Sequence, residues 1–317
     1  MVHDRSRELL IAILSIAVVG LLALPVNAAV EVHGRNMGLG QVDNLKNTVG
    51  SLNWGGYVAA NSLTSPTAAV TQVTASWIVQ PAAKTSTATY SAQWTGIGGF
   101  FSSDQTLIQL GTESDYYRNA AHYYAWIEML PSSEQVISLS VKPGDTIVAS
   151  ISPATNPVSN SWLMTMTDVT TGMSFTSPTE TYKSSMLSGE YIEERPALCN
   201  AFTCTLTTLA NFGTADFGYY YTKQSGTEYL TVGGVIGALG STSNGWTNEN
   251  VIMYANNGRT QIAIPSGLSA DGTSFTMTYH ATTGGSGFGG PAGHPEKWGI
   301  SRNTVEDAPG PLDHHVH

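Results

Sequence analysis

Charged side chains are scarce in this sequence. Only 11% of its 317 residues are Asp, Glu, Lys or Arg, and 13 basic residues stand against 23 acidic ones, which gives a formal net charge of −10. The deficit of positive charge argues against nucleic acid or an anionic membrane as a partner. Few carboxylates in native ion pairs also suit a protein to acid, although the same composition is ordinary for an exported β protein.

One long apolar run is present, from residue 9 to residue 24, after a polar start that holds two arginines. Small residues follow it up to Ala28, as at a signal-peptidase site. The run is shorter than the roughly 20 residues that span a bilayer. We therefore expect residues 1–28 to be a signal peptide cleaved near Ala28, and the protein to be secreted. An uncleaved N-terminal anchor is the alternative, and only then do we expect a stable membrane partner.

Cysteine is nearly absent, with Cys199 and Cys204 as the only two. In an exported protein a close pair most simply forms a disulfide that closes a small loop. The alternative, a metal site built on the pair, needs further ligands, and no histidine lies within tens of residues.

Long amphipathic helices are also missing. From residue 51 onward, short runs rich in Val, Ile, Thr, Tyr and Trp alternate with turn signals such as Lys142-Pro143-Gly144-Asp145 and Asp271-Gly272-Thr273. Many short strands at this spacing predict an all-β protein, a large antiparallel sandwich or barrel, in a single domain over residues 51–283.

The flanking segments have no such period. Residues 29–50 are expected to be a linker or pro-segment, and residues 284–317 a flexible tail that carries Gly, Pro and four of the eight histidines, His294, His314, His315 and His317. A flexible tail offers no fixed ligand geometry, so no metal site is expected there.

Several hydrolase motifs are absent as well. The sequence contains no Gly-x-Ser-x-Gly, no His-Glu-x-x-His and no Asp-Thr-Gly or Asp-Ser-Gly. Within residues 51–283 the histidines are only His122 and His280, so a mechanism that pairs Ser or Cys with His is poorly supplied. A carboxylate paired with a neutral amide functions at lower pH, because glutamate has a reference pKa of about 4.3 and glutamine carries no charge.

Carboxylates gather in one place, Gly189-Glu190-Tyr191-Ile192-Glu193-Glu194-Arg195-Pro196. On a strand, Glu190, Ile192 and Glu194 share one face and Glu193 lies on the other. A solvated edge strand is the plain interpretation of such a cluster. Other segments change the interpretation, and they occur in the order Ser51-Leu52-Asn53-Trp54-Gly55-Gly56, Trp94-Thr95-Gly96-Ile97, Ile108-Gln109-Leu110-Gly111, Tyr124-Ala125-Trp126-Ile127-Glu128 and, after the acidic cluster, Asn211-Phe212-Gly213.

In this order the motifs resemble those of the glutamic peptidases, the G1 or eqolisin family, over roughly Asn53 to Tyr279. The resemblance implies a large concanavalin A-like, lectin-like β-sandwich and a secreted acid endopeptidase that needs no cofactor or metal. It implies that Glu194 is the catalytic base and Gln109 the oxyanion donor. It also implies substrate-binding roles for a further set, Trp54, Trp126, Glu128, Glu113 and Glu190. The cysteine pair falls where fungal members have a disulfide.

The resemblance has further consequences. Partners are expected to be polypeptide substrates, and the protein is expected to be a monomer. Residues 29–50 are expected to inhibit the enzyme until acid releases them, with His33, Arg35 and Lys46 pairing with cleft carboxylates. Two positions depart from the family pattern: Gly98 and Glu113 stand where the family commonly has aspartates. Both departures predict altered local pKa values and an altered orientation of Gln109.

Two other classes of function stay open at this point. All-β sandwiches of this size include lectins and glycoside hydrolases, and retaining glycosidases need two carboxyl groups about 5 Å apart. Glu190 and Glu194 are four residues apart on the predicted strand, roughly 13 Å, which does not meet this requirement. A non-catalytic surface or adhesion protein is favoured if the N-terminal anchor is retained.

Overall fold

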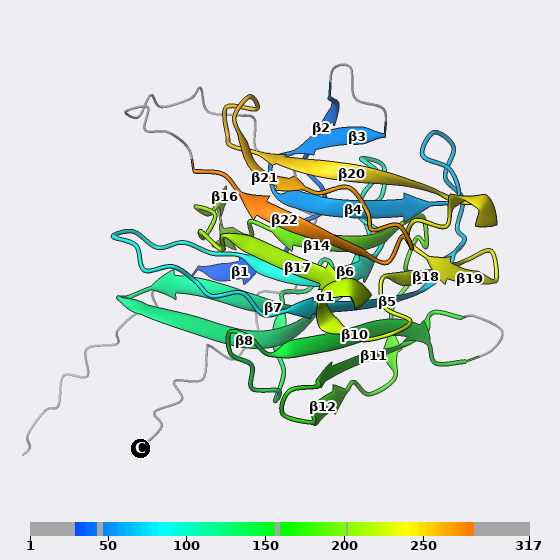
Figure 1. Ribbon diagram of the computed structural model, residues 1–317, viewed down its shortest axis with the longest axis horizontal. Coiled ribbons are helices and arrows are strands. Elements are labelled where there is room, and N and C mark those ends of the chain that lie inside the picture. The colour runs from blue at the N-terminus through cyan, green and yellow to red at the C-terminus, as the bar shows by residue number, and fades with distance from the viewer. Residues whose placement is uncertain (1–28, 43–46, 156–158, 201, 282–317) are drawn as a thin grey trace, which may run out of the picture.

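The computed structural model describes residues 29–42, 47–155, 159–200 and 202–281. It is built almost entirely of β-strands, and Figure 1 shows them arranged in layers. The strand pairings form one large sheet that folds back on itself and a separate three-stranded sheet, and every pairing is antiparallel except that of β20 with β3. The expected all-β sandwich is therefore confirmed. The signal-peptide and C-terminal tail predictions fall on residues outside the described ranges.

The first layer carries the motifs singled out above. Its strands pair in the order β9-β8-β7-β6-β14-β4-β20, and β20 also pairs with β3 and β21. Their bounds are Gln135–Val136 (β9), Ala120–Met129 (β8), Ile108–Tyr117 (β7), Ala92–Ile97 (β6), Gly189–Glu194 (β14), Trp54–Ala60 (β4), Thr247–Tyr254 (β20), Thr48–Ser51 (β3) and Gln261–Pro265 (β21).

The second layer follows from β21 in the order β22-β17-β5-β10-β11. These strands are Ser274–Tyr279 (β22), Thr214–Gly218 (β17), Val70–Ile78 (β5), Thr146–Pro153 (β10) and Ser161–Asp168 (β11). Short strands extend its edges: Met173–Thr176 (β12), Glu180–Thr181 (β13), Tyr229–Val232 (β18) and Val235–Ala238 (β19). The helices within the described ranges are one turn each, Tyr219–Thr222 (α1) and the 3-10 turn Thr242–Asn244.

The main core lies between the layers and follows from alternation along each strand. Odd-numbered residues of β4 and β14, such as Tyr57 and Tyr191, face inward and meet the apolar residues of β5, including Trp77. Their even-numbered neighbours face the other way and form a second apolar cluster with Trp54 and Ile192. The first layer is thus covered on both faces, and its outer face bears the predicted site.

The disulfide is confirmed. Cys199 and Cys204 are bonded and stand opposite each other in a hairpin made by β15 (Ala197–Cys199) and β16 (Cys204–Leu206). The hairpin follows Glu194 closely and so fixes the turn at the end of β14. No helix within the described ranges is long and apolar enough to cross a membrane.

Residues 30–41 form strands that the sequence pattern did not reveal. Strand β1 (Val30–Val32) pairs with β15, and β2 (Gly38–Gln41) pairs with β3. The chain between them crosses the outer face of the first layer, where Val32, His33 and Gly34 are buried. We call residues 30–41 the N-terminal strap.

Candidate active site

The predicted site residues gather on the outer face of the first layer. Paired residues of antiparallel strands point to the same face, and the register aligns three rows across β4, β14, β6, β7 and β8. The rows are Trp54, Glu194, Ala92, Glu113 and Tyr124; then Gly56, Ile192, Trp94, Gly111 and Trp126; then Val58, Glu190, Gly96, Gln109 and Glu128. Motifs far apart in sequence therefore form one surface.

Glycine at position 111 leaves room for the side chains of Trp94 and Trp126, its two neighbours in the middle row. A β-carbon there would lie 2.6 Å from the β-carbon of Trp94 and 2.7 Å from the indole of Trp126. Any larger residue would force the two indoles apart. The glycine of the apolar-Gln-x-Gly motif is thus needed for the packing of the two indoles beside Gln109.

Gln109 is oriented by Glu128, its direct partner across the strands. The Gln109 amide Nε2 donates to Glu128 Oε2 at 2.8 Å and to the main-chain carbonyl of His33 at 2.9 Å. An amide nitrogen has two hydrogens, and both are thus directed. Glu128 positions the amide, and the amide holds a peptide carbonyl.

Glu194 lies at the other end of the same surface and is fully buried. Trp94 Nε1 donates to its Oε2 at 2.8 Å, and Asn53 Nδ2 donates to its Oε1 at 3.2 Å. Burial raises the pKa of Glu194, while the contact with His33 and the two donors oppose that rise. The carboxyl is therefore buried but supplied with groups that favour its ionised form.

The N-terminal strap lies across this surface, and it supplies a residue that the predicted domain did not include. His33 Nδ1 lies 3.6 Å from Glu194 Oε2. The next carbonyl, that of Gly34, accepts from Trp54 Nε1 at 2.9 Å and from Asn53 Nδ2 at 3.3 Å. A stretch of the chain's own backbone thus lies against Gln109 and Trp54.

Of the three basic residues expected to pair with cleft carboxylates, only His33 is shown to do so. Arg35 instead donates to the main-chain carbonyl of Asp104, at 2.7 Å. Lys46 lies outside the described residues.

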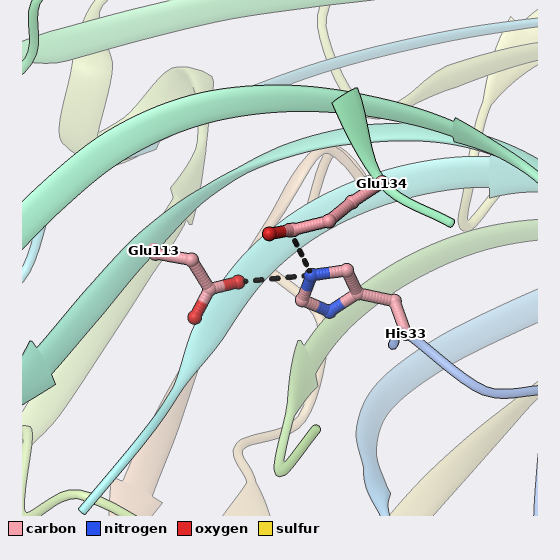
Figure 2. Close-up of side chains that lie close together, drawn as sticks. All are labelled: His33, Glu113 and Glu134. Carbon is pink, nitrogen blue, oxygen red and sulfur yellow. Dashed lines mark hydrogen bonds and ion pairs between the residues drawn. The ribbon is translucent and has the colours of Figure 1, made fainter. Parts of the chain in front are cut away.

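Carboxyl groups crowd around the His33 ring. Its Nε2 lies 3.2 Å from Glu113 Oε1 and 3.1 Å from Glu134 Oε2, as Figure 2 shows. Glu31 and Asp115 stand close to Glu113. Burial raises the pKa of Glu134 to about 8. Burial, followed by repulsion from Glu31, Asp115 and Glu134, raises that of Glu113 well above its usual range. Sequence reasoning missed Glu134 because it lies in a turn outside every motif.

A metal ion is one ligand that this cluster could hold. His33, Glu113 and Glu134 each offer an atom, and all lie within 4.8 Å of one another. The contacts of 3.1 and 3.2 Å are hydrogen-bond lengths between His33 Nε2 and the two carboxyl groups. Glu113 Oε1 also accepts from Trp126 Nε1 at 3.0 Å. As these side chains lie, they hydrogen-bond to protein groups.

Glu190 shares the face but not these contacts. Its buried carboxyl lies against Ser188 and the backbone of Gly98, and burial raises its pKa well above the usual range. The nearest charge that adds to this rise is Asp104, not Glu128 or Glu194. The structure therefore gives no contact that links Glu190 to the strap.

Gly98 does not leave this corner short of a carboxyl, as its departure from the family pattern suggested. Its φ is +95°, and a β-carbon there would lie 2.9 Å from the carbonyl of Thr106 and 3.2 Å from Asp104 Oδ2. Asp104 is itself buried and accepts from the Gly99 amide at 2.9 Å. A carboxyl from another position thus stands beside Gly98, and an aspartate at 98 would be strained.

Solved structures share this fold. The scytalido-glutamic peptidase, in complex with a transition-state analogue inhibitor, aligns with a TM-score of 0.56 and 21% identity, over 72% of this chain and 98% of that one. SCP-B, a member of the eqolisin family solved with the tripeptide Ala-Ile-His, aligns with a TM-score of 0.54 and 22% identity, over 72% and 98%. A search of curated protein sequences finds no match.

The sequence itself matches the Peptidase A4 family over residues 52–261. The chain therefore belongs to this family of glutamic peptidases and is an endopeptidase of the glutamic type, a hydrolase whose substrates are polypeptides. The sequence had left two alternatives open, a lectin-like or glycoside-hydrolysing sandwich and an adhesion protein. Neither is the family that the chain matches.

Proposed function

We propose that this protein is an acid endopeptidase in which Glu194 activates water and Gln109 stabilises the oxyanion. One observation carries the proposal. The Gln109 amide donates to a main-chain carbonyl at 2.9 Å, and the side chain of the same residue, His33, lies 3.6 Å from the Glu194 carboxyl. A donor held on a peptide carbonyl, and a carboxyl against the side chain of the same residue, are the two kinds of group that hydrolysis of a peptide bond uses.

The chemistry proceeds by direct attack of water. Ionised Glu194 takes a proton from a water aimed at the scissile carbonyl carbon, and the water oxygen bonds to that carbon. The carbonyl oxygen gains negative charge, which the Gln109 N–H stabilises while Glu128 keeps the amide oriented. Protonated Glu194 then donates to the leaving nitrogen, the C–N bond breaks, and the carboxylate is restored.

The N-terminal strap keeps the enzyme latent in this proposal. It occupies the peptide position with Val32, His33 and Gly34 buried, so substrate cannot enter. The contact between His33 and Glu194 favours the ionised form of that carboxyl and so opposes the rise in its pKa. Acid protonates Glu194 and thereby weakens this contact, which promotes release of the strap. Residues 29–50 would thus be the inhibitory pro-segment.

Export is part of the same proposal. It rests on the apolar run that ends before Ala28 and on the disulfide between Cys199 and Cys204, which suits an oxidising compartment.

Incubation of the purified chain at pH 3–4 with denatured casein, and separately with polysaccharides, tests the proposed function. We expect new peptides from casein and no sugar release, and no peptides from the Glu194→Gln variant. Equal peptide release by wild type and Glu194→Gln, or release of sugars alone, would overturn the proposal.

A further inference from the structure

The side chain of His33 fits a slot that no motif predicted. The slot is formed by Glu113, Trp126 and Glu134, and we call it the imidazole slot. The His33 ring stacks on Trp126 with centroids 3.8 Å apart and planes 2° from parallel. Its Nε2 meets one carboxyl on each side, as Figure 2 shows, at 3.2 Å for Glu113 and 3.1 Å for Glu134.

The backbone shows which substrate residue this slot serves. His33 is the residue whose carbonyl accepts from Gln109, and the Gly34 carbonyl beyond it accepts from Trp54. Under the proposed function, which this inference rests on, the bond held at Gln109 is the one that is cut. The imidazole slot therefore takes the side chain on the N-terminal side of the scissile bond.

We propose that the enzyme prefers substrates with histidine at this position, and that Glu134 and Glu113 determine the preference. A flat ring is favoured because Trp126 offers a stacking face, and more so when the ring is cationic. An N–H donor is favoured because two buried carboxyls converge on one point. Phenylalanine stacks but leaves the carboxyls without a partner, and lysine donates but cannot stack.

The acceptor groups around the slot agree with a hydrogen-bond-donating side chain. Asp115 lies close to Glu113, and the Tyr124 hydroxyl donates to Glu134. Glu194 faces Nδ1, the other ring nitrogen of His33. Glu31 adds another carboxyl while the strap is in place. Glu113 is held in place by a side-chain hydrogen bond with Asp115. A site built to bond a substrate N–H discriminates strongly against an analogue that lacks it.

The first test compares peptides that differ only at this position: His, Phe, Lys and Leu. They are offered at one acid pH to the full chain after acid treatment, with loss of the strap checked by mass spectrometry. We expect kcat/KM for the His peptide to exceed that for Phe by about tenfold or more. Glu134→Leu, which removes both acceptor oxygens, should reduce this His-to-Phe ratio severalfold. Glu180→Leu is the control, because among the described strands β13 pairs with β11, in the other layer. Equal rates for His and Phe, or a ratio that Glu134→Leu leaves unchanged, overturn the inference.

A second test needs no turnover. In untreated chain at pH 7.5 the slot holds His33, so cleavage after Arg35 by added trypsin reports opening of the strap. Glu134→Leu should speed that cleavage by about tenfold, and Glu180→Leu should leave it unchanged. An unchanged rate in Glu134→Leu overturns the slot. If strap-free protein cuts no peptide at any pH while Glu134→Leu still speeds trypsin, the proposed peptidase function fails and the slot stands only as the holder of the strap.

Discussion

Glu193 and Glu194 are neighbours on β14, both fully buried, and they face opposite sides of the first layer. Burial raises the pKa of each. Glu193 faces the core, where Gln80 Nε2 donates to it at 2.7 Å. Glu194 faces the N-terminal strap, where an indole, an amide and an imidazole surround it.

The difference teaches that burial alone does not define a catalytic carboxyl. On the core face Glu193 accepts from Gln80 and is covered by the apolar core, so it has no path to a peptide. On the outer face the polar groups meet backbone carbonyls, and those carbonyls belong to a segment that is able to leave. The same alternation that builds the core therefore decides which glutamate reaches a substrate.

The strongest test of the difference between the two faces is to replace each glutamate in turn by glutamine. Glu194→Gln should lower peptide hydrolysis by about 10³-fold or more, because it removes the base and keeps the shape. Glu193→Gln, its matched control, should affect stability alone. Activity of Glu194→Gln within tenfold of wild type, in protein whose circular dichroism is unchanged, would move the base elsewhere, with Glu128 and Glu190 next to be tried.

The two faces also carry two buried glutamines for comparison. Gln109→Ala should lower kcat by about 10²–10³-fold with little change in KM, because an oxyanion donor acts mainly in the transition state. Gln93, which pairs with Glu193 on the core side, supplies the control as Gln93→Ala. Steady-state kinetics on both variants decide. A change confined to KM in Gln109→Ala would reduce Gln109 to a substrate-positioning role.

Loss of the N-terminal strap should convert a closed outer face into an open one. Protein held at pH 3 is expected to gain activity by about tenfold or more as residues up to about Thr48 are removed, because β3 remains held in the sheet by β20. Mass spectrometry of timed samples should find the new N-terminus between residue 42 and Ser51. Full activity in a chain that keeps Val30 would contradict the pro-segment.

The carboxyls around His33 should make the protein more stable in acid than at neutral pH. Glu134 has a pKa of about 8 in the folded protein against about 4.3 for an unperturbed glutamate. Its stabilising contribution is therefore complete below about pH 4.3 and is lost as the pH rises toward 8. We expect Tm to fall by several degrees between pH 4 and pH 8.

Calorimetry in the Glu194→Gln background, where self-cleavage should not occur, measures this effect. Glu134→Gln should reduce the fall in Tm, and Glu180→Gln should not. A Tm that rises from pH 4 to pH 8 would show that other groups dominate.

Much of the outer face could be predicted from local sequence. Strand alternation separates Glu193 from Glu194, and short motifs mark Gln109, Trp126 and Glu128. Glu134 and Asp104 could not be found in this way, because their roles come from contacts across 101 residues for Glu134 with His33 and 81 residues for Asp104 with Ser185. Only the fold reveals that a turn, a strap and a loop converge on the motifs.

The strands of the strap were missed for a related reason. Residues 30–32 and 38–41 are runs of only three and four residues, too short for alternation to identify a strand, and they become strands because β15 and β3 offer open edges. Gly98 shows the opposite case. The motif suggested a missing carboxyl, whereas its positive φ and the nearby Asp104 explain why glycine stands there.

The smallest effect should come from two tryptophans, one on each side of the first layer. Trp94 Nε1 donates to Glu194 Oε2 at 2.8 Å, and Trp77 Nε1 donates to Thr112 Oγ1 at 2.9 Å in the core. A bond to the ionised carboxyl lowers its pKa, so Trp94→Phe should raise the pKa of Glu194. The acid limb of kcat/KM, where Glu194 becomes ionised, should then move to higher pH by about half to one unit, since one such bond contributes about 1 kcal/mol. Trp77→Phe also loses one buried N–H bond, but from the core, so it should lower Tm and leave the limb in place. Measurement of kcat/KM from pH 2 to 7 for both variants separates the two faces. A limb that Trp94→Phe leaves unmoved, or that both variants shift alike, would mean that ionisation of a group other than Glu194 controls the acid limb.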